Sequence, residues 1–497
     1  MRRLAHFWGV LLAVAVVAVI AWLTEPAGSQ PALQAAGRTA AVTSVTRSCP
    51  PVAMGTGSSR VAMIAMPSQS ASAQGGTAAP AGSATLSAVP AETASASAAK
   101  SAMAAQPVTV SASGAVATVR VPGKAGAAGT GGAVVAATGQ MAEGFEAEQV
   151  NSAGIGLVSC THPGSDMWFV GTGTSAGAPE IRLYLMNTGT LGASVDVTIL
   201  TDTGQQNGLD NAITVAPDQT VAENIAPFVS GSQALALHVQ TSSGQVAASA
   251  WEGDGAGSGS WLPQAAPPST TVVIPGLTVA SSAARLFVTV PGSIDARLKV
   301  VAYTPAGPFA PFSATVDASG TATTPVTLSS LGASAAGLRL TSTVPIVAGV
   351  LVPGAGIGAF TTATPPVTEQ GVVAGNPAAP GLTVGLLLTA PAGAVQARVT
   401  VVTAAGAAGG TSPAAGQTVT VRAGHTLAVA VPRPSGRQPY AIVITPLAGS
   451  GPLYAVRAVT SGAEGLSGPV TSLLPVTSAL TVITLPPVKN SYTAVLP

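Results

Sequence analysis

Residues 183–204 have the sequence LYLMNTGTLGASVDVTILTDTG, in which apolar and polar side chains alternate on both sides of a short turn. Two later stretches repeat this pattern: LFVTVPGSIDARLKVVAYTPAG (286–307) and LLLTAPAGAVQARVTVVTAAG (386–406). Alternation with a period of two, rich in Val, Ile and Thr, is typical of half-buried strands, and the intervening Gly, Asn and Pro residues favour turns. The sequence therefore predicts groups of β-strands that recur along the chain.

The recurring unit is about 100 residues long, since the matching ends PPSTTVVIPG (267–276) and PPVTEQGVVAG (365–375) lie about that far apart. We expect β-repeats at 159–266, 267–364 and 365–497, the last of them with an additional C-terminal strand. AVVAATGQMAEGFEAEQV (133–150) resembles ALALHVQTSSGQVAASAWEG (234–253), which indicates a degenerate β domain at 46–158. About seven strands per unit favour an all-β fold of tandem immunoglobulin-like β-sandwiches. A β-propeller with two blades per repeat is the alternative.

The N-terminus carries a hydrophobic segment, LAHFWGVLLAVAVVAVIAWL (4–23), directly after Arg2 and Arg3. About 20 apolar residues span a bilayer, and preceding arginines keep the N-terminus in the cytoplasm. We therefore expect a cytoplasmic tip and transmembrane anchor at 1–24, a stem at 25–45, and the bulk of the chain outside the cell membrane. Cleavage of the segment as a signal peptide, giving a secreted protein, is the alternative.

The composition excludes some functional classes. Only 7% of the 497 residues are charged, the net charge is +1, and four histidines are present. A chain of this kind lacks the positive field that holds nucleic acid, and it is unlike a metalloenzyme rich in His and acids. We predict no cofactor. Residues 67–106 are rich in Ala, Ser, Gly and Pro, and we expect a low-complexity loop there, with a hairpin at 107–121 after it.

The two cysteines, Cys49 and Cys160, both lie on the side of the chain expected to be exported. An even pair outside the cytoplasm predicts a disulfide. The bridge would close a long loop, for which chain-entropy arguments give a stabilisation of about 4–5 kcal/mol.

Few residues suggest chemistry. Ser175 lies in GTSAG (173–177), which matches the G-x-S-x-G motif of hydrolases, but Pro179 and a strand follow where that motif needs a helix. We interpret Ser175 as a loop serine, because neither His238 nor His425 can be placed beside it. The loop TDTGQQNGLDN (201–211) is rich in oxygen ligands, and we interpret it as turn chemistry, with a calcium site as the alternative.

The remaining candidates are acidic and aromatic residues. Glu143, Glu146 and Glu148 cluster in one segment, where we expect a solvated strand edge. Trp168 and Phe169 are expected in the core. Trp261, in GSGSWLP (257–263), is the candidate ligand contact: we expect it to be exposed and to stack on a sugar.

The segment WFVGTGTSAGAPEIRLYLMNTGTLGASVDVTIL (168–200) resembles uncharacterised secreted or membrane-anchored β-repeat proteins of actinobacteria, and the resemblance extends over roughly 43–488. Its motifs are strand patterns, and it brings no catalytic residues. The expected function is a non-enzymatic, membrane-anchored extracytoplasmic protein that serves as an envelope scaffold or protein-interaction module. Its partners would be the membrane, through the N-terminal helix, and cell-envelope proteins or glycans. A carbohydrate- or cell-wall-binding protein is the first alternative, and a serine hydrolase is the second.

Overall fold

The computed structural model describes residues 38–485, with gaps at 53–58, 68–79, 93–107, 121–129, 152–156, 208, 210–211, 257, 279–283, 311–314, 329–330, 332–334, 355–356, 405–415, 436–437 and 463–468. Within these residues the protein is all-β, as expected, and its helices are the short 3₁₀ turns η1 (Gly139–Met141), η2 (Thr174–Ala176) and η3 (Ala226–Val229). In this described part of the chain no helix is long and apolar enough to cross a membrane. The expected anchor at 1–24 lies outside the described residues.

The chain divides into two units, residues 41–481 and the two chain ends, 1–40 with 482–497. In the terminal unit β1 (Arg38–Ala41) pairs with β35 (Val482–Leu485). All other sheets belong to residues 41–481, and they come in pairs, one pair for each of four successive segments that we call repeats 1 to 4. We call the sheet that contains a repeat's first strand its leading sheet, and the other its second sheet.

The strands of repeats 1 and 2 follow the same plan. The leading sheet of repeat 1 has the order β2 (Ser44–Cys49), β7 (Thr130–Thr138), β4 (Ala84–Pro90), β5 (Val108–Val110), and its second sheet has the order β6 (Ala117–Arg120), β3 (Ser59–Ile64), β8 (Glu146–Asn151), β9 (Val158–Ser159). The leading sheet of repeat 2 contains β10 (Asp166–Thr172), β16 (Ala234–Ser243), β12 (Ala193–Thr201), β13 (Gly204–Gln206) and β14 (Ile213–Val215). Its second sheet has the order β15 (Gln219–Asn224), β11 (Glu180–Asn187), β17 (Ala247–Gly253), β18 (Gly259–Leu262).

Repeats 3 and 4 complete the set. Repeat 3 contains β19 (Ser269–Thr278), β20 (Ala284–Val290), β21 (Ala296–Thr304), β22 (Gly307–Phe309), β23 (Val316–Ala318), β24 (Ala322–Leu328), β25 (Ala335–Val352) and β26 (Ala359–Thr362). Its leading sheet (β19, β21, β22, β23) pairs with the first part of β25 and its second sheet (β20, β24, β26) is built on the last part, so β25 belongs to both. The leading sheet of repeat 4 has the order β27 (Gly371–Asn376), β32 (Tyr440–Pro446), β29 (Val395–Val402), β30 (Gln417–Val421), and its second sheet has the order β31 (His425–Ala430), β28 (Leu382–Ala390), β33 (Tyr454–Ser461), β34 (Val470–Val476).

Each pair of sheets packs face to face around an apolar core. In repeat 2, for example, Phe169 and Leu237 of the leading sheet share a cluster with Leu183 and Leu185 of the second sheet. The alternation noted in the sequence supplies these inward-facing residues. The chain weaves between the two sheets, since β10, β12 and β16 lie in one and β11, β15 and β17 in the other.

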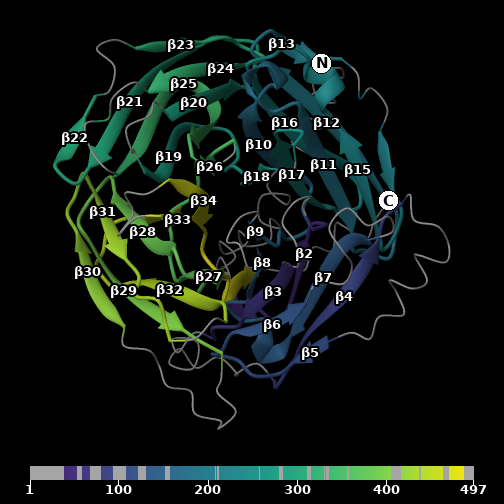
Figure 1. The fold of residues 1–497 in the computed structure, drawn as a ribbon, viewed down its shortest axis with the longest axis vertical. Coiled ribbons are helices and arrows are strands. Elements are labelled where there is room, and N and C mark those ends of the chain that lie inside the picture. The colour runs from purple at the N-terminus through teal and green to yellow at the C-terminus, as the bar shows by residue number, and fades with distance from the viewer. Residues whose placement is uncertain are drawn as a thin grey trace, which may run out of the picture. The chain divides into compact units, whose positions relative to one another are not determined.

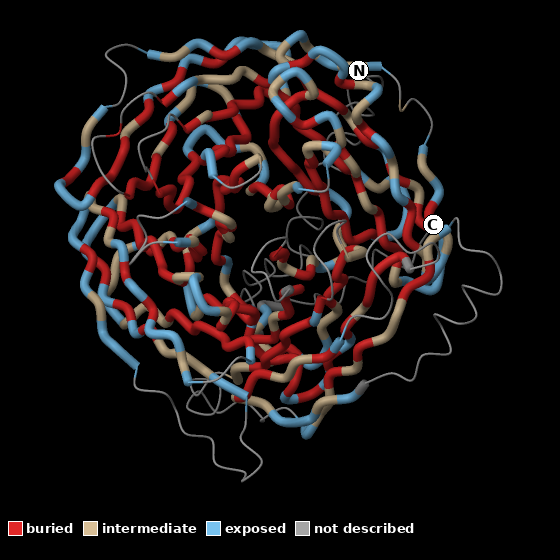
Figure 2. Tube along the Cα trace, in the orientation of Figure 1, coloured by how far each residue is buried: buried red, intermediate tan, exposed pale blue. Residues whose placement is uncertain are grey.

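The leading sheet of each repeat also packs on the second sheet of the next. Phe287, Val347 and Phe360 of repeat 3 belong to the core of repeat 2, and Leu387 and Val456 of repeat 4 belong to the core of repeat 3. Figure 1 shows these sheets following one another around a ring, and Figure 2 shows buried residues along the strands between them.

The ring is completed by two further contacts. Met186 of repeat 2 packs with Val89 and Val134 of repeat 1. Ile64 and Val150 of repeat 1 pack in the core of repeat 4. Most strands are therefore covered on both faces.

Three expectations need correction. The loop predicted at 67–106 contains a core strand, β4, where Leu86 and Val89 are buried. The stem predicted at 25–45 contains β1 and the start of β2. The predicted hairpin at 107–121 is wrong, because β5 and β6 lie in different sheets and the chain crosses between them at Gly114. A segment rich in Ala and Ser is predicted from its composition to be a flexible loop, yet such small side chains also fit between closely packed sheets.

Replacing Phe287 with Ala should destabilise the fold by about 3–5 kcal/mol, because Phe287 is fully buried where repeats 2 and 3 meet and its loss would leave a cavity. Urea unfolding measures the change. The matched control is Leu191→Ala, at a side chain that is 78% exposed, which should shift stability by less than about 0.5 kcal/mol. Equal effects of the two substitutions would contradict the packing described here.

Candidate functional site

A buried ion pair lies where repeat 1 meets repeat 4. Arg457, on β33, donates from Nη2 to Glu148 Oε1 of β8 at 2.9 Å, and both side chains are at most 1% exposed. Arg457 Nη1 also donates to the Gly375 carbonyl of β27 at 3.1 Å, and the Gly375 N–H donates to Glu148 Oε2 at 2.9 Å. The Gly375 backbone thus lies between the two charged groups. A side chain at this position would collide with Val150 and Glu148, so the contact needs glycine.

The pair is ionic. Burial raises the pKa of the Glu148 carboxyl, while the Arg457 charge and the Gly375 N–H lower it. An arginine stays charged in proteins, so the carboxylate is the partner that balances it. A buried pair of this kind adds little net stability, but loss of one partner leaves an uncompensated charge. The pair joins β8 of repeat 1 to β33 of repeat 4, where the ring of sheets closes.

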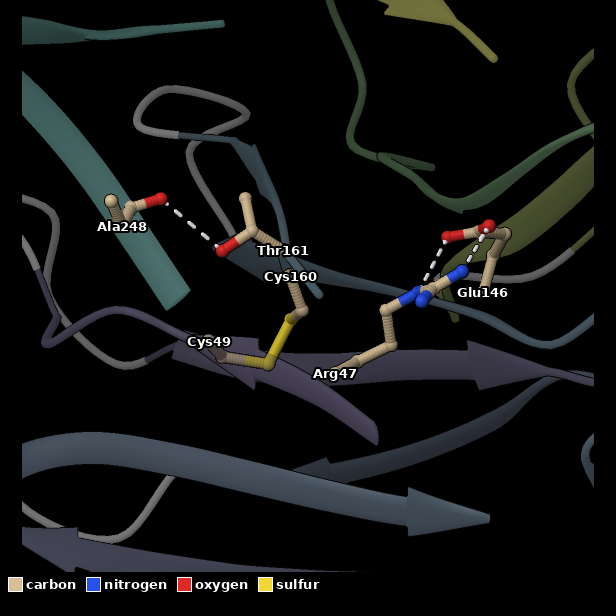
Figure 3. The surroundings of a disulfide bond; sticks show 6 residues. All are labelled: Arg47, Cys49, Glu146, Cys160, Thr161 and Ala248. Atoms are coloured by element: carbon tan, nitrogen blue, oxygen red, sulfur yellow. Dashed lines mark hydrogen bonds and ion pairs between the residues drawn. A yellow bond between two sulfur atoms is a disulfide. The ribbon is translucent and has the colours of Figure 1, made fainter. Parts of the chain in front are cut away.

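A disulfide fastens the neighbouring part of repeat 1. Cys49, at the end of β2, is bonded to Cys160, just after β9, with S–S 1.96 Å and Cα–Cα 4.2 Å, which confirms the predicted bridge. The backbones of Ser48 and Thr161 exchange hydrogen bonds of 2.7 and 2.9 Å beside it. Figure 3 shows the bridge together with an ion pair between Arg47 and Glu146, 2.8 Å long. The bridge therefore joins the two sheets of repeat 1.

Thr161 extends this contact to repeat 2, because its Oγ1 donates to the Ala248 carbonyl of β17 at 3.2 Å (Figure 3). The disulfide joins the end of β2 to the residue after β9, and the ion pair between Arg47 and Glu146 joins β2 to β8. The polar groups here hold sheets together.

A further buried acid, Glu252 on β17, lies inside repeat 2. Thr172 of β10 donates to it twice, from its N–H to Oε1 at 2.7 Å and from its Oγ1 to Oε2 at 2.5 Å. Gly171 leaves the space for the carboxyl, since a Cβ there would meet Glu252 Oε1. Burial raises the pKa of Glu252 to about 8, against the hydrogen bonds from Thr172, which lower it. Glu252 is therefore mostly protonated at neutral pH.

The structure places the aromatic candidates in the core. Trp168 and Phe169 are buried, as expected. Trp261, the expected ligand contact, is 6% exposed and packs edge-on against Trp251, with ring centroids 5.1 Å apart. The expectation of an exposed Trp261 is therefore wrong, because β18 lies beside β17 and turns this ring inward.

The hydrolase candidates do not come together. Ser175 Oγ donates to the Ser232 carbonyl at 2.6 Å, and its segment is the 3₁₀ turn η2. His238 Nε2 lies 2.9 Å from Asp166 Oδ1 and its ring stacks on Trp168 at 3.8 Å, so its contacts are to other residues than Ser175. Burial lowers the pKa of His238.

The remaining candidates also have structural contacts. Asp202 Oδ1 accepts from the N–H of Gln233, 31 positions further along the chain, at 2.8 Å, while Asp210 and Asn211 lie outside the described residues. Within the described ranges, no cluster of His, Cys, Asp and Glu could hold a metal ion. The solvated edge expected at Glu143, Glu146 and Glu148 is wrong, because Glu143 and Glu148 are buried and Glu146 is paired with Arg47. Sequence reasoning missed Arg457 and Glu252, for which no motif gave a signal.

These features define a class: a repeat-built, all-β protein with a disulfide, in which buried ionic and polar contacts join neighbouring sheets. The chain belongs to the family of unknown function DUF5719, whose family model matches residues 130–432, more than half of the sequence. This confirms the expectation of an uncharacterised family.

Other comparisons add little. Comparison with curated proteins gives no match. Among solved structures, an alpha-L-rhamnosidase of Streptomyces avermitilis complexed with L-rhamnose is 10% identical, with 85% of this chain aligned to 55% of that chain and a TM-score of 0.11. At that TM-score the likeness carries no argument about fold or function.

Replacing Arg457 with Met should cost about 3–5 kcal/mol, because Glu148 would be left buried without its cation. Adding Glu148→Gln to that variant should restore part of the loss, since the buried charge is then removed. Urea unfolding of the single and double variants measures the coupling. The control is Arg398→Gln, at an exposed arginine of β29. A cost below about 1 kcal/mol for Arg457→Met would contradict the assigned role.

Glu252 should make stability fall as the pH rises from about 5 to 8. Its folded-state pKa of about 8 lies above the ordinary value of 4.5, so the native state holds a proton that the unfolded state has lost. The contribution is about 1.4 kcal/mol per pH unit. Glu252→Gln should flatten the dependence of the urea midpoint on pH over this window, and Glu92→Gln, at an exposed position, should leave it unchanged. Parallel curves for wild type and Glu252→Gln would refute the assignment.

Proposed function

We propose that the protein is a non-enzymatic extracytoplasmic scaffold or protein-interaction module of the cell envelope, held at the membrane by the segment 1–24. The observation that carries the proposal is the closure of the sheets between repeats 1 and 4, where Glu148, Arg457 and Gly375 join three separate sheets. In the described residues, each sheet of this closed arrangement packs on a neighbouring sheet on either side, which limits how far one sheet can shift against another. Rigid repeats present their loops and outer strands at fixed positions, which is what a binding platform requires.

The ring of sheets supports a β-propeller with two blades per repeat as the finer description of the fold. In a propeller, four-stranded sheets pack face to face around a centre. Here every leading sheet packs on the second sheet of its own repeat and on that of the next. The core shared by the two sheets of a repeat supports the sandwich expectation at the level of one repeat. An immunoglobulin-like topology stays a prediction.

The disulfide supports an extracytoplasmic location. Disulfides persist in oxidising compartments and are rare in the cytosol, and both cysteines of this chain are joined in one bridge. The hydrophobic segment after Arg2 and Arg3 supports the same location, as a membrane anchor or, in the secreted alternative, as a cleaved signal.

The two alternatives have weaker support. A carbohydrate- or cell-wall-binding function depends on an exposed aromatic residue, and Trp261 is buried. A serine hydrolase depends on a base beside Ser175, whose hydroxyl instead donates to a backbone carbonyl. The scaffold proposal is consistent with the contacts of the buried polar groups, since Arg457, Glu148 and Glu252 all join neighbouring sheets.

Protease added to intact spheroplasts should digest the chain, while a cytoplasmic control protein stays intact. In the same cells, alkylation without reduction should leave Cys49 and Cys160 unlabelled, and reduction should expose both. Full protection from protease, or two thiols that react before reduction, would overturn the location. Labelling by a fluorophosphonate probe that is lost in Ser175→Ala would overturn the non-enzymatic assignment in favour of the hydrolase.

A further inference from the structure

A pocket of about 640 Å³ lies at one end of repeat 4, where β28 begins and the connection after β31 leads into β32. This volume falls within the range of small-molecule sites, about 300–1,000 Å³. Apolar and polar groups contribute about equally to the lining, and two of its side chains carry strong hydrogen-bond donors. The lining includes Leu382, Val384, Val431, Arg433 and Tyr440.

Tyr440 is the first of the two donors. Its side chain is 1% exposed and its ring packs in the core of repeat 4, yet its hydroxyl has no hydrogen-bond partner among the described residues. Burial raises the pKa of Tyr440, so the hydroxyl keeps its proton and remains a donor. A buried hydroxyl without a partner costs stability, and phenylalanine would fill the same space without that cost. An unpaired donor in the wall of a pocket is what a ligand acceptor would satisfy.

Arg433 is the second donor. It is exposed at the pocket, and one of its N–H groups, on Nη1, donates to the Ala379 carbonyl at 3.3 Å. A guanidinium has five N–H donors, so donors remain for a ligand. The positive charges of Arg433 and Arg457 both act on the Tyr440 hydroxyl. Arg457 is neutralised by Glu148, whereas the described residues that line the pocket around Arg433 include no carboxylate.

We propose that this pocket binds a small organic carboxylate with an apolar body. The carboxylate would accept from Arg433 and from the Tyr440 hydroxyl, and the body would lie against Leu382, Val384 and Val431. Guanidinium groups match the geometry of a carboxylate, and a phenol adds a directed donor. This site goes beyond the scaffold function, which needs no small ligand.

Calorimetric titration of the full chain tests the site with three carboxylates, 2-naphthoate, cinnamate and hexanoate, and with the corresponding neutral amides. At least one carboxylate should bind about tenfold or more tightly than its amide. Arg433→Gln should remove this preference. Tyr440→Phe should weaken carboxylate binding about three- to tenfold, while the melting temperature of the unliganded variant stays equal to that of the wild type or rises.

The control Arg398→Gln removes an exposed arginine from β29 of the same repeat and should leave binding unchanged. The melting temperature of unliganded Tyr440→Phe separates a ligand role from a structural one. If the hydroxyl supported the fold, its removal would lower this melting temperature even without ligand. No binding of any of the three carboxylates, equal affinity for acid and amide, or unchanged affinity in Tyr440→Phe would overturn the proposal.

Discussion

The contact of Glu148 with Arg457 is the constraint on which the rest of the structure depends. In the described part of residues 41–481, the other junctions between sheets join strands of one repeat or of successive repeats. The junction that contains this pair joins the first repeat to the last, and its two charged residues lie 309 positions apart. Hydrophobic burial alone would accept several pairings of such similar sheets, because their apolar faces are made of the same Val, Leu and Ala residues. A buried charge that finds its counter-charge in one place excludes the others.

The same principle, applied without a cation, explains Glu252. Its carboxyl reaches from the second sheet of repeat 2 to the first strand of the leading sheet, as Arg457 does in repeat 4. In each case a glycine on that first strand leaves room for a buried carboxyl group: Gly171 for Glu252, and Gly375 for Glu148 of repeat 1. Repeats 2 and 4 thus both have a buried polar contact between their two sheets, made by a neutral acid in repeat 2 and by an ion-paired arginine in repeat 4.

The strands could be predicted from the sequence because alternation reports directly on which residues face a neighbouring layer. The disulfide could be predicted because there was one possible pair, and Trp168 and Phe169 because large aromatic residues in a strand seldom face water. The acids could not be placed. From the alternation, Glu146 and Glu148 are predicted to lie on the solvent-exposed face of a strand. That prediction would be correct for a sheet with one open face. In a ring both faces of the sheet are covered, and nothing local to residues 143–150 reveals the second cover, which comes from repeat 4.

The woven order of the strands has a consequence for the way the chain matures. Since β10, β12 and β16 alternate with β11, β15 and β17, neither sheet of a repeat is complete until nearly all of that repeat has been synthesised. The repeats can then condense one after another from the N-terminus. The face of β8 that packs on repeat 4 is the exception. Glu148 is synthesised early, and its partners Gly375 and Arg457 are synthesised only with the last repeat. Until then the second sheet of repeat 1 exposes an apolar face that carries the Glu148 carboxylate. That charge keeps the face hydrated until the leading sheet of repeat 4 packs on it.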